Sequence, residues 1–316
     1  MALIVAYRAS ACVHVAAELG LPDLLAPRPQ TADELAAATG ANRNALHRLL
    51  RALVALEVLA QDGDRFQLTP MGEELREGRL GGAARFFGRE PVWGTWGALK
   101  HSVLTGGRAF DHVHGMRNWE YYKSHPEAAA RFDGAMRAMT SGIAPAVARA
   151  YDFSRFRVVV DVGGGDGTLL AEILRAHSGV RGILFDRPDV VARAQQPALE
   201  KIGGNFMEKV PEGGDAYLMK SIIHDWDDAE AVQILRRCRE AMRDDAMLLV
   251  VERVLPETIG PADLEALLGD LNMLTGPGGL ERTETEFRDL FQGAGLRLQR
   301  VVPTGTPWNI LEAAPS

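Results

Sequence analysis

The feature that most constrains the fold is an apolar strand that runs straight into a glycine-rich turn and then into a helix. Val158 to Val162 is an apolar run broken only by Asp161, which is typical of a strand buried on both faces. Strand and helix patterns then alternate, with strands at 182–185, 216–219 and 247–251 and helices at 168–177 and 229–242. This alternation predicts an α/β fold with a doubly wound parallel sheet. Two final strands, at 296–302 and 309–313, are expected to be antiparallel.

The turn after the first strand has the spacing acidic-x-Gly-x-Gly-x-Gly, from Asp161 to Gly167. Such a turn lets the backbone approach a ligand closely and directs the amides of a helix N-terminus at an anion. The dinucleotide fingerprint Gly-x-Gly-x-x-Gly is not met in any frame, because from Gly163 its last position falls on Thr168. The spacing is instead the one found in proteins that bind S-adenosylmethionine, whose anionic group is a carboxylate.

Polar residues follow the next two strands at the same predicted edge of the sheet. Asp186 lies 19 residues beyond the last glycine of the turn, where a carboxylate suits the hydroxyls of a ribose. The alternative is that Asp186 caps a helix beside Pro188. Asn205 and Phe206 follow the third strand or its loop, where a side-chain amide could bind adenine.

His224 follows the fourth strand, with Asp225 and Trp226 directly after it. Ligands bind outside the carboxyl ends of the strands in open α/β sheets, so we expect His224 to lie over the cofactor. This position favours a catalytic role over a structural one.

The first 80 residues predict short helices followed by a hairpin. Thr31 to Glu34 form a capping box, Asn42 caps a leucine-rich helix, and residues 62–68 form a turn and strand. Together these elements make a winged-helix-like module, a kind that often binds DNA. However, residues 1–79 contain ten acidic residues, eight arginines and no lysine, a net charge of −2. Phosphate binding needs a positive surface, so we expect a role in dimerisation and no nucleic-acid partner.

Composition narrows the class of protein further. The 316 residues are 47% hydrophobic and 24% charged, with a net charge of −7, which is ordinary for a globular protein. Since no run of about 18 apolar residues occurs, we expect no membrane partner. The two cysteines lack the spacing of a zinc site. The N-terminus lacks the charged and apolar regions of a signal peptide, which favours a cytoplasmic protein.

Residues 80–150 are predicted to be helical and are rich in aromatic residues and methionine. A helical core explains most of these side chains. A cluster of this kind also suits a pocket for a flat apolar ring.

These motifs together resemble the S-adenosylmethionine-dependent O-methyltransferases of the caffeic-acid type, which include bacterial enzymes that tailor polyketides and phenazines. The resemblance covers nearly the whole chain and rests on motifs at 17–25, 46–53, 162–167, 224–228, 252–256 and 278–283. It implies the class I methyltransferase fold, a Rossmann-like doubly wound sheet with an N-terminal, mainly α-helical, winged-helix-like dimerisation domain. We expect that domain at 1–90, a helical linker that contributes to the substrate pocket at 91–150, and the cofactor-binding catalytic domain at 151–316.

The resemblance also implies a homodimer and assigns roles to individual residues. His224 would be the general base, with Glu252 and Glu281 flanking it and Asp225 adjacent. Cofactor-binding residues would be Asp161, Gly163, Gly164, Gly165, Gly167, Asp186, Arg187, Asn205, Phe206, Lys220, Ser221 and Trp226. The acceptor pocket would be lined by Trp119, Phe132, Met136, Met139, Asp270, Asn272 and Met273. The family commonly has Asp where Asn205 stands; because an amide oxygen also accepts a hydrogen bond, we expect cofactor binding to survive.

The expected chemistry agrees with these roles. A phenol, whose unperturbed pKa is about 10, becomes a good nucleophile only when its proton is removed, and imidazole is a suitable base. A carboxylate beside the ring would orient it and stabilise the imidazolium. The product would be S-adenosylhomocysteine, and no metal is needed. Two alternatives stay open: a relative that decarboxylates or hydroxylates a polyketide, and a winged-helix regulator that senses S-adenosylmethionine.

Overall fold

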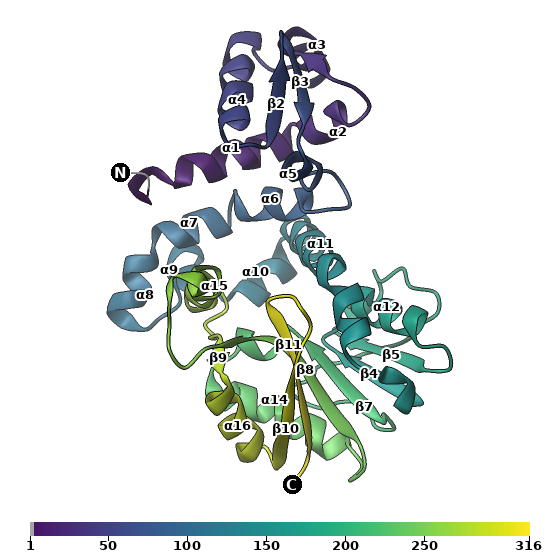
Figure 1. The fold of residues 1–316 in the computed structure, drawn as a ribbon. Coiled ribbons are helices and arrows are strands. Elements are labelled where there is room, and N and C mark those ends of the chain that lie inside the picture. The colour runs from purple at the N-terminus through teal and green to yellow at the C-terminus, as the bar shows by residue number, and fades with distance from the viewer. Residues whose placement is uncertain (1–2) are drawn as a thin grey trace. The chain divides into compact units, whose positions relative to one another are not determined.

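The computed structural model describes residues 3–316 and divides into two compact units (Figure 1). The first comprises the chain up to Gly94 together with Tyr122–Met139, and the second comprises Thr95–Tyr121 together with Thr140–Ser316. The division into a dimerisation domain at 1–90, a linker at 91–150 and a catalytic domain at 151–316 stays a prediction, because these compact units do not test the function of each part. Within residues 3–316, no helix is long and apolar enough to cross a membrane.

The first unit contains the predicted helices and hairpin. Its sheet is antiparallel in the order β1-β3-β2, formed by Gln30–Thr31, Arg65–Leu68 and Leu59–Asp62 respectively. The elements before Gly94 also include a 3-10 helix, η1 (Leu3–Val5), and the α-helices α1 (Tyr7–Glu18), α2 (Leu21–Leu25), α3 (Ala32–Thr39), α4 (Arg43–Ala55), α5 (Pro70–Glu73) and α6 (Gly81–Phe87).

Local sequence signals set the boundaries of these elements. The Thr31 hydroxyl accepts a hydrogen bond from the Glu34 amide, and the Glu34 carboxylate accepts one from the Thr31 amide, which confirms the predicted capping box. The Asn42 side chain caps α4 as predicted. The apolar face of α4 buries Leu46, Leu50 and Leu53 in a core shared with Phe66 of the hairpin.

The second unit is built on one long sheet, which confirms the predicted doubly wound architecture. Its strand order is β10-β11-β8-β7-β4-β5-β6; the strands from β8 to β6 are parallel, and β10 and β11 are antiparallel. The strands are β4 (Val158–Val162), β5 (Arg181–Asp186), β6 (Glu200–Gly203), β7 (Ala216–Lys220), β8 (Met247–Leu255), β10 (Leu296–Pro303) and β11 (Trp308–Pro315). The short strand β9 (Arg282–Thr283) pairs with the end of β8.

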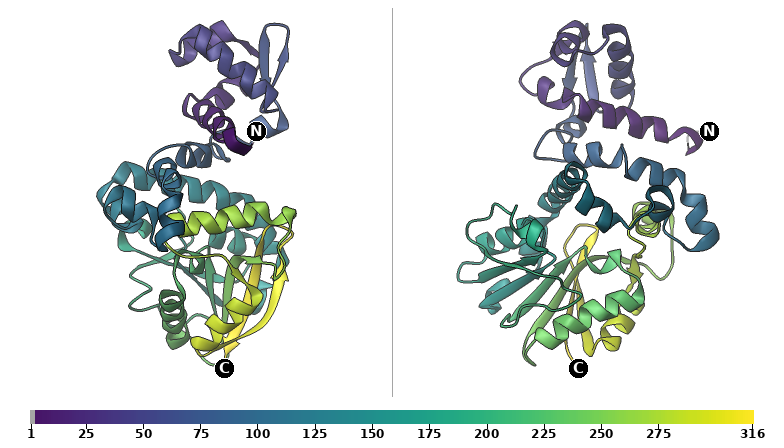
Figure 2. Two further views of the ribbon diagram at one scale, coloured as in Figure 1. Left: turned by 90° about the vertical axis from the view of Figure 1, so that its left-hand side faces the viewer. Right: turned by 180° about the vertical axis from the view of Figure 1, so that it is seen from behind.

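Helices cover both faces of this sheet. One face packs against α14 (Asp228–Ala241) and α16 (Glu284–Gly293), and the other packs against α12 (Thr168–Ala176) and the last part of α11 (Pro126–Ala150). Figure 2 shows α14, in green, running across the strands in the view from behind. The remaining helices are α7 (Val92–Gly97), α8 (Leu99–Thr105), α9 (Ala109–His114), α10 (Asn118–Ser124), η2 (Phe153–Arg155), α13 (Pro188–Val191), η3 (Ile223–Asp225), η4 (Pro261–Asp263) and α15 (Leu264–Thr275).

The strand order places a topological switch point between β4 and β7. From β4 the chain continues to β5 and β6 on one side, and it then returns to form β7 on the other side. Ligands of open α/β sheets bind in the crevice at the carboxyl ends of the strands at such a point. At these ends lie the glycine turn after β4, Ser221 after β7 and Glu252 near the end of β8.

Candidate active site

The glycine turn has a backbone that other residues adopt only with strain. Gly163, Gly165 and Gly167 have φ angles of +73°, +61° and +81°, in the left-handed region that favours glycine. At Gly164 a Cβ atom would lie only 2.5 Å from the Asp161 carboxyl carbon. The turn therefore depends on glycine at these positions, and the N-terminus of α12 follows it directly.

Asp186 ties the turn to the end of β5. One carboxylate oxygen accepts a hydrogen bond from the Gly165 amide at 2.8 Å, and the other accepts one from the Arg187 amide. The N-cap of α13 is Arg187, so the alternative prediction, that Asp186 caps this helix, is wrong. The Arg187 guanidinium donates to both oxygens of Asp189 and is held on that side chain.

Asp161, which is buried, and Lys220, which is partly buried, are two ionisable groups near the turn. One oxygen of Asp161 is buried without a hydrogen-bond partner, and burial raises the pKa of this carboxyl to about 7. Burial also lowers the pKa of Lys220 to about 8, and its ammonium donates to the Thr140 hydroxyl at 3.3 Å. Asp161 Oδ2 can therefore still accept a hydrogen bond, and it lies beside the glycine turn. This arrangement fits the charged amino-acid end of S-adenosylmethionine.

The residues expected near adenine are held by their neighbours. The Asn205 side-chain oxygen accepts from the Met207 amide at 3.0 Å, and its nitrogen donates to Glu208 at 3.0 Å. Trp226 is largely buried, with Phe206 edge-on at 5.9 Å and Trp119 stacked at 6.5 Å between ring centroids. These contacts hold the side chains of Asn205 and Phe206 in place. Trp226 is also part of the hydrophobic core.

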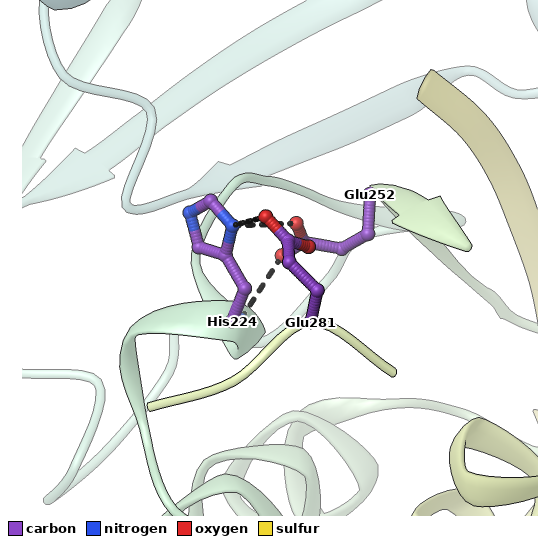
Figure 3. A group of neighbouring side chains, drawn as sticks. All are labelled: His224, Glu252 and Glu281. Atoms are coloured by element: carbon purple, nitrogen blue, oxygen red, sulfur yellow. Dashed lines mark hydrogen bonds and ion pairs between the residues drawn. The ribbon is translucent and has the colours of Figure 1, made fainter. Parts of the chain in front are cut away.

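His224 lies on the short helix η3, and the Glu252 carboxylate accepts hydrogen bonds from backbone amides at the start of this helix. One Glu252 oxygen accepts hydrogen bonds from the amides of Ile222 and Ile223, both at 2.9 Å. The imidazole Nδ1 lies 3.0 Å from Glu281 Oε1 and 3.5 Å from Glu252 Oε2 (Figure 3). The other ring nitrogen, Nε2, points away from both glutamates and lies 3.7 Å from Asp225 Oδ1.

The charges in this cluster change each other's proton affinity. Burial disfavours the charged imidazole, but the Glu252 charge, the hydrogen bond to Glu281 and Asp225 together raise the pKa of His224 to about 10. Burial raises the pKa of Asp225 to about 7 and also raises the pKa of Glu252, against the opposing effect of His224. The cluster therefore holds a proton on His224 firmly, which makes the neutral ring a strong base.

The same three residues are a set of donors that could bind a cation. The closest ligand atoms of His224, Glu252 and Glu281 all lie within 4.8 Å of one another. However, the Glu252 oxygen Oε1 already accepts backbone amides, and His224 Nδ1 already faces Glu281 at hydrogen-bond distance. These contacts fit a proton held between the groups.

The residues expected to line the acceptor pocket fall into two sets. Asp270, Asn272 and Met273 lie on α15 in the second unit, as does Trp119 on α10; the Asp270 carboxylate accepts from the Glu281 amide at 2.9 Å. The Asn272 side-chain oxygen accepts from the Trp96 indole at 2.9 Å. The other set, on α11 in the first unit, is Phe132, Met136 and Met139.

Within the first unit, the Phe132 ring packs against Phe86 and Tyr122. The structure therefore brings Asp270 to the catalytic cluster and gives Asn272 a structural partner. The pocket as a whole stays a prediction.

Ser221, expected to bind the cofactor, has a positive φ of +54°, and its hydroxyl accepts from the Trp308 indole. Sequence reasoning missed two arginines that hold the site. Arg253 stacks on the Trp308 ring at 4.7 Å, and Arg282 lies behind the His224 helix. Arg282 lies inside the motif at 278–283 that carries the resemblance, and that position is the signal that could have identified it.

Comparisons with known proteins agree with this geometry. Residues 96–297 match a model of the O-methyltransferase domain, and residues 1–77 match a model of the O-methyltransferase dimerisation domain. The chain is 40% identical to a phenazine O-methyltransferase, PhzM, from Lysobacter antibioticus, over 99% of this chain and 94% of that protein. It is 41% identical to an O-demethylpuromycin-O-methyltransferase from Streptomyces alboniger, over 100% of this chain and 88% of that protein.

Solved structures give the same result. The crystal structure of LaPhzM matches with a TM-score of 0.95 at 38% identity, over 100% of this chain and 98% of that one. The O-methyltransferase NcsB1, solved with S-adenosylmethionine and a hydroxy-methyl-naphthoic acid, matches with a TM-score of 0.80 at 33% identity, over 97% and 96%. The chain therefore belongs to the O-methyltransferase family, as an enzyme that uses S-adenosylmethionine.

Proposed function

We propose that this enzyme methylates a hydroxyl group of a small aromatic natural product, with His224 as the general base. The observation that carries this role is the imidazole whose Nδ1 is held by Glu281 while Nε2 points away from both glutamates. The substrate class is supported by relatives whose names refer to phenazine, demethylpuromycin and a dihydroxynaphthoate.

The proposed chemistry uses the strong basicity of the cluster. With its proton on Nδ1, His224 accepts the hydroxyl proton at Nε2, and the resulting imidazolium is stabilised by Glu252 and Glu281. The raised pKa of His224 brings the proton affinity of its neutral ring towards that of a phenolate, since an unperturbed phenol has a pKa of about 10. S-adenosylmethionine, when bound, supplies the methyl group on a positively charged sulfur and leaves as neutral S-adenosylhomocysteine.

The other residues bind and orient. Asp186 and the glycine turn would hold the nucleoside, with Asn205 and Phe206 at the adenine. Asp161 and Lys220 would take the amino-acid end. We propose catalysis without a metal, because His224 Nδ1 lies at hydrogen-bond distance from Glu281 and Glu252 Oε1 accepts backbone amides. Chelation with EDTA should therefore leave turnover unchanged, and a loss restored by a divalent cation would contradict this part of the proposal.

The dimerisation-domain match supports a homodimer. Nucleic acid is not expected to be a partner, because the first 79 residues carry a net negative charge. A winged-helix regulator remains testable by a gel shift at physiological salt.

The decisive experiment combines His224→Ala with a panel of phenazine, naphthoate, anthracycline and flavonoid acceptors and labelled S-adenosylmethionine. We expect the variant to lose turnover by about 100-fold or more, while the Kd for S-adenosylmethionine from calorimetry stays nearly unchanged. His177→Ala, which removes another partly buried imidazole of the same unit, is the control. Retained turnover in His224→Ala would remove the base role.

Transfer to nitrogen is the second candidate. It is favoured by relatives named as N-methyltransferases, at 37% and 34% identity. Matched acceptors that carry only an amine or only a hydroxyl distinguish the two, because both products gain one methylene in mass. A product that loses the mass of CO₂ or gains an oxygen would instead support the decarboxylase or hydroxylase alternative.

A further inference from the structure

Arg282 is an arginine with no exposed side-chain surface, in the strand β9 beside the end of β8. Burying a guanidinium costs several kcal/mol unless its donors are satisfied. Such a group needs an explanation beyond packing, because an apolar side chain would fill the same volume at lower cost.

The five N–H groups of Arg282 meet five acceptor contacts. Nη2 donates to the Trp226 carbonyl at 2.8 Å and to the Asp228 carboxylate at 2.9 Å. Nη1 donates to the carbonyls of Ile223 and Leu280 at 3.2 and 3.3 Å, and Nε donates to Asp228 at 3.0 Å. Four of the five contacts are therefore with residues 223–228 around His224, and the fifth, with Leu280, lies within the segment of Arg282 itself.

The carbonyls of Ile223 and Trp226 lie on either side of His224 in the sequence. The amides of the same turn are held from the other side by Glu252. The segment just before β9 also packs directly on this turn, because a Cβ at Gly279 would overlap the His224 carbonyl oxygen. The catalytic turn is thus clamped by its carbonyls through Arg282 and by its amides through Glu252.

The same segment carries Glu281, which bonds the imidazole at 3.0 Å. Arg282 therefore fixes the backbone of His224 relative to the residue that orients the ring. A shift of about 1 Å at a catalytic group can cost about 100-fold in rate.

We propose that Arg282 is a positioning residue for methyl transfer, which holds the backbone turn of His224 in register with Glu281. This inference rests on the proposed function for its kinetic consequence only. In this role Arg282 touches neither substrate nor cofactor. The role depends on the planar guanidinium, which donates to several acceptors at once.

The test compares Arg282→Lys, which keeps the charge but loses the planar guanidinium, with Arg239→Lys. Arg239 also donates to a backbone carbonyl and a carboxylate, on α14, so it is a matched control. In Arg282→Lys we expect kcat to fall about 100-fold with a KM for the acceptor within about threefold of wild type. We also expect the His224 ring titration in the ligand-free protein, followed by NMR and assigned with His224→Ala, to move about one unit lower as contact with Glu281 loosens.

A second variant covers the case in which Arg282→Lys does not fold. Asp228→Ala removes one partner of the guanidinium from a side chain that is 73% exposed, and we expect about a tenfold loss of kcat with a smaller shift in the same titration. Unchanged kcat and His224 titration in a folded Arg282→Lys protein, or in Asp228→Ala, would overturn the proposal. The NMR titration reports on it even if no acceptor is methylated by the wild type, in which case the proposed function fails separately.

Discussion

Replacing Glu281 by glutamine tests how the carboxylates set the proton affinity of His224. The substitution keeps the shape of the side chain but removes a negative charge 3.0 Å from Nδ1. A hydrogen bond to a charged group contributes about 1.5–3 kcal/mol, and one pKa unit corresponds to about 1.4 kcal/mol. The pKa of His224, about 10 in the wild type, should therefore fall by roughly one to two units.

The sign of the kinetic effect follows from the role of the base. His224 accepts a proton only when its ring is neutral, so below its pKa the active fraction falls tenfold per pH unit. The rising limb of kcat/KM against pH should lie high in the wild type and move to lower pH in Glu281→Gln. The plateau value of kcat should also fall, because a weaker base removes the hydroxyl proton less readily.

The assay is the pH profile of kcat/KM between pH 6 and 10.5, together with NMR titration of the ligand-free protein. Glu312→Gln is the matched control, because Glu312 is also a buried glutamate of the second unit but pairs with Arg300 on the neighbouring strand. A rising limb that stays in place or moves to higher pH in Glu281→Gln would refute this account of the cluster.

Three further predictions concern binding and stability. Gly164→Ala should raise the Kd for S-adenosylmethionine by at least about tenfold in calorimetry, because its Cβ would meet Asp161 at 2.5 Å; an unchanged Kd would count against a cofactor site at the glycine turn. Asn205→Asp should weaken cofactor binding by about fivefold, because it sets a second carboxylate against Glu208; tighter binding would contradict this. Thr31→Ala should lower the free energy of unfolding by about 1 kcal/mol in denaturant titration through loss of the cap, and no change would show that this cap contributes nothing.

Local patterns predicted most of the fold because the signals are local. The strand β4, the helix α14 and the antiparallel pair β10–β11 follow from short runs of apolar residues and their spacing. The caps at Thr31 and Asn42 follow from side chains that bond amides two or three residues away. Such contacts need no knowledge of the rest of the chain.

The part of the site that sequence reasoning missed depends on contacts between distant segments. Arg282 donates hydrogen bonds to the turn after β7, 59 and 56 residues earlier in the chain. The Trp96 indole donates to the side-chain oxygen of Asn272, which lies 176 residues later. Trp226 is predicted to bind the cofactor, and in the structure its stacking with Trp119 also makes it part of the core. Spacing along the chain does not reveal pairings of this kind.

The central claim, that His224 Nε2 removes the proton of the acceptor, is tested most directly by a crystal structure with S-adenosylhomocysteine and a methylatable acceptor. The account predicts the acceptor oxygen within about 3.2 Å of Nε2 and Glu281 still bonded to Nδ1. An imidazole turned away from the cofactor sulfur, with no acceptor oxygen near Nε2, would contradict it.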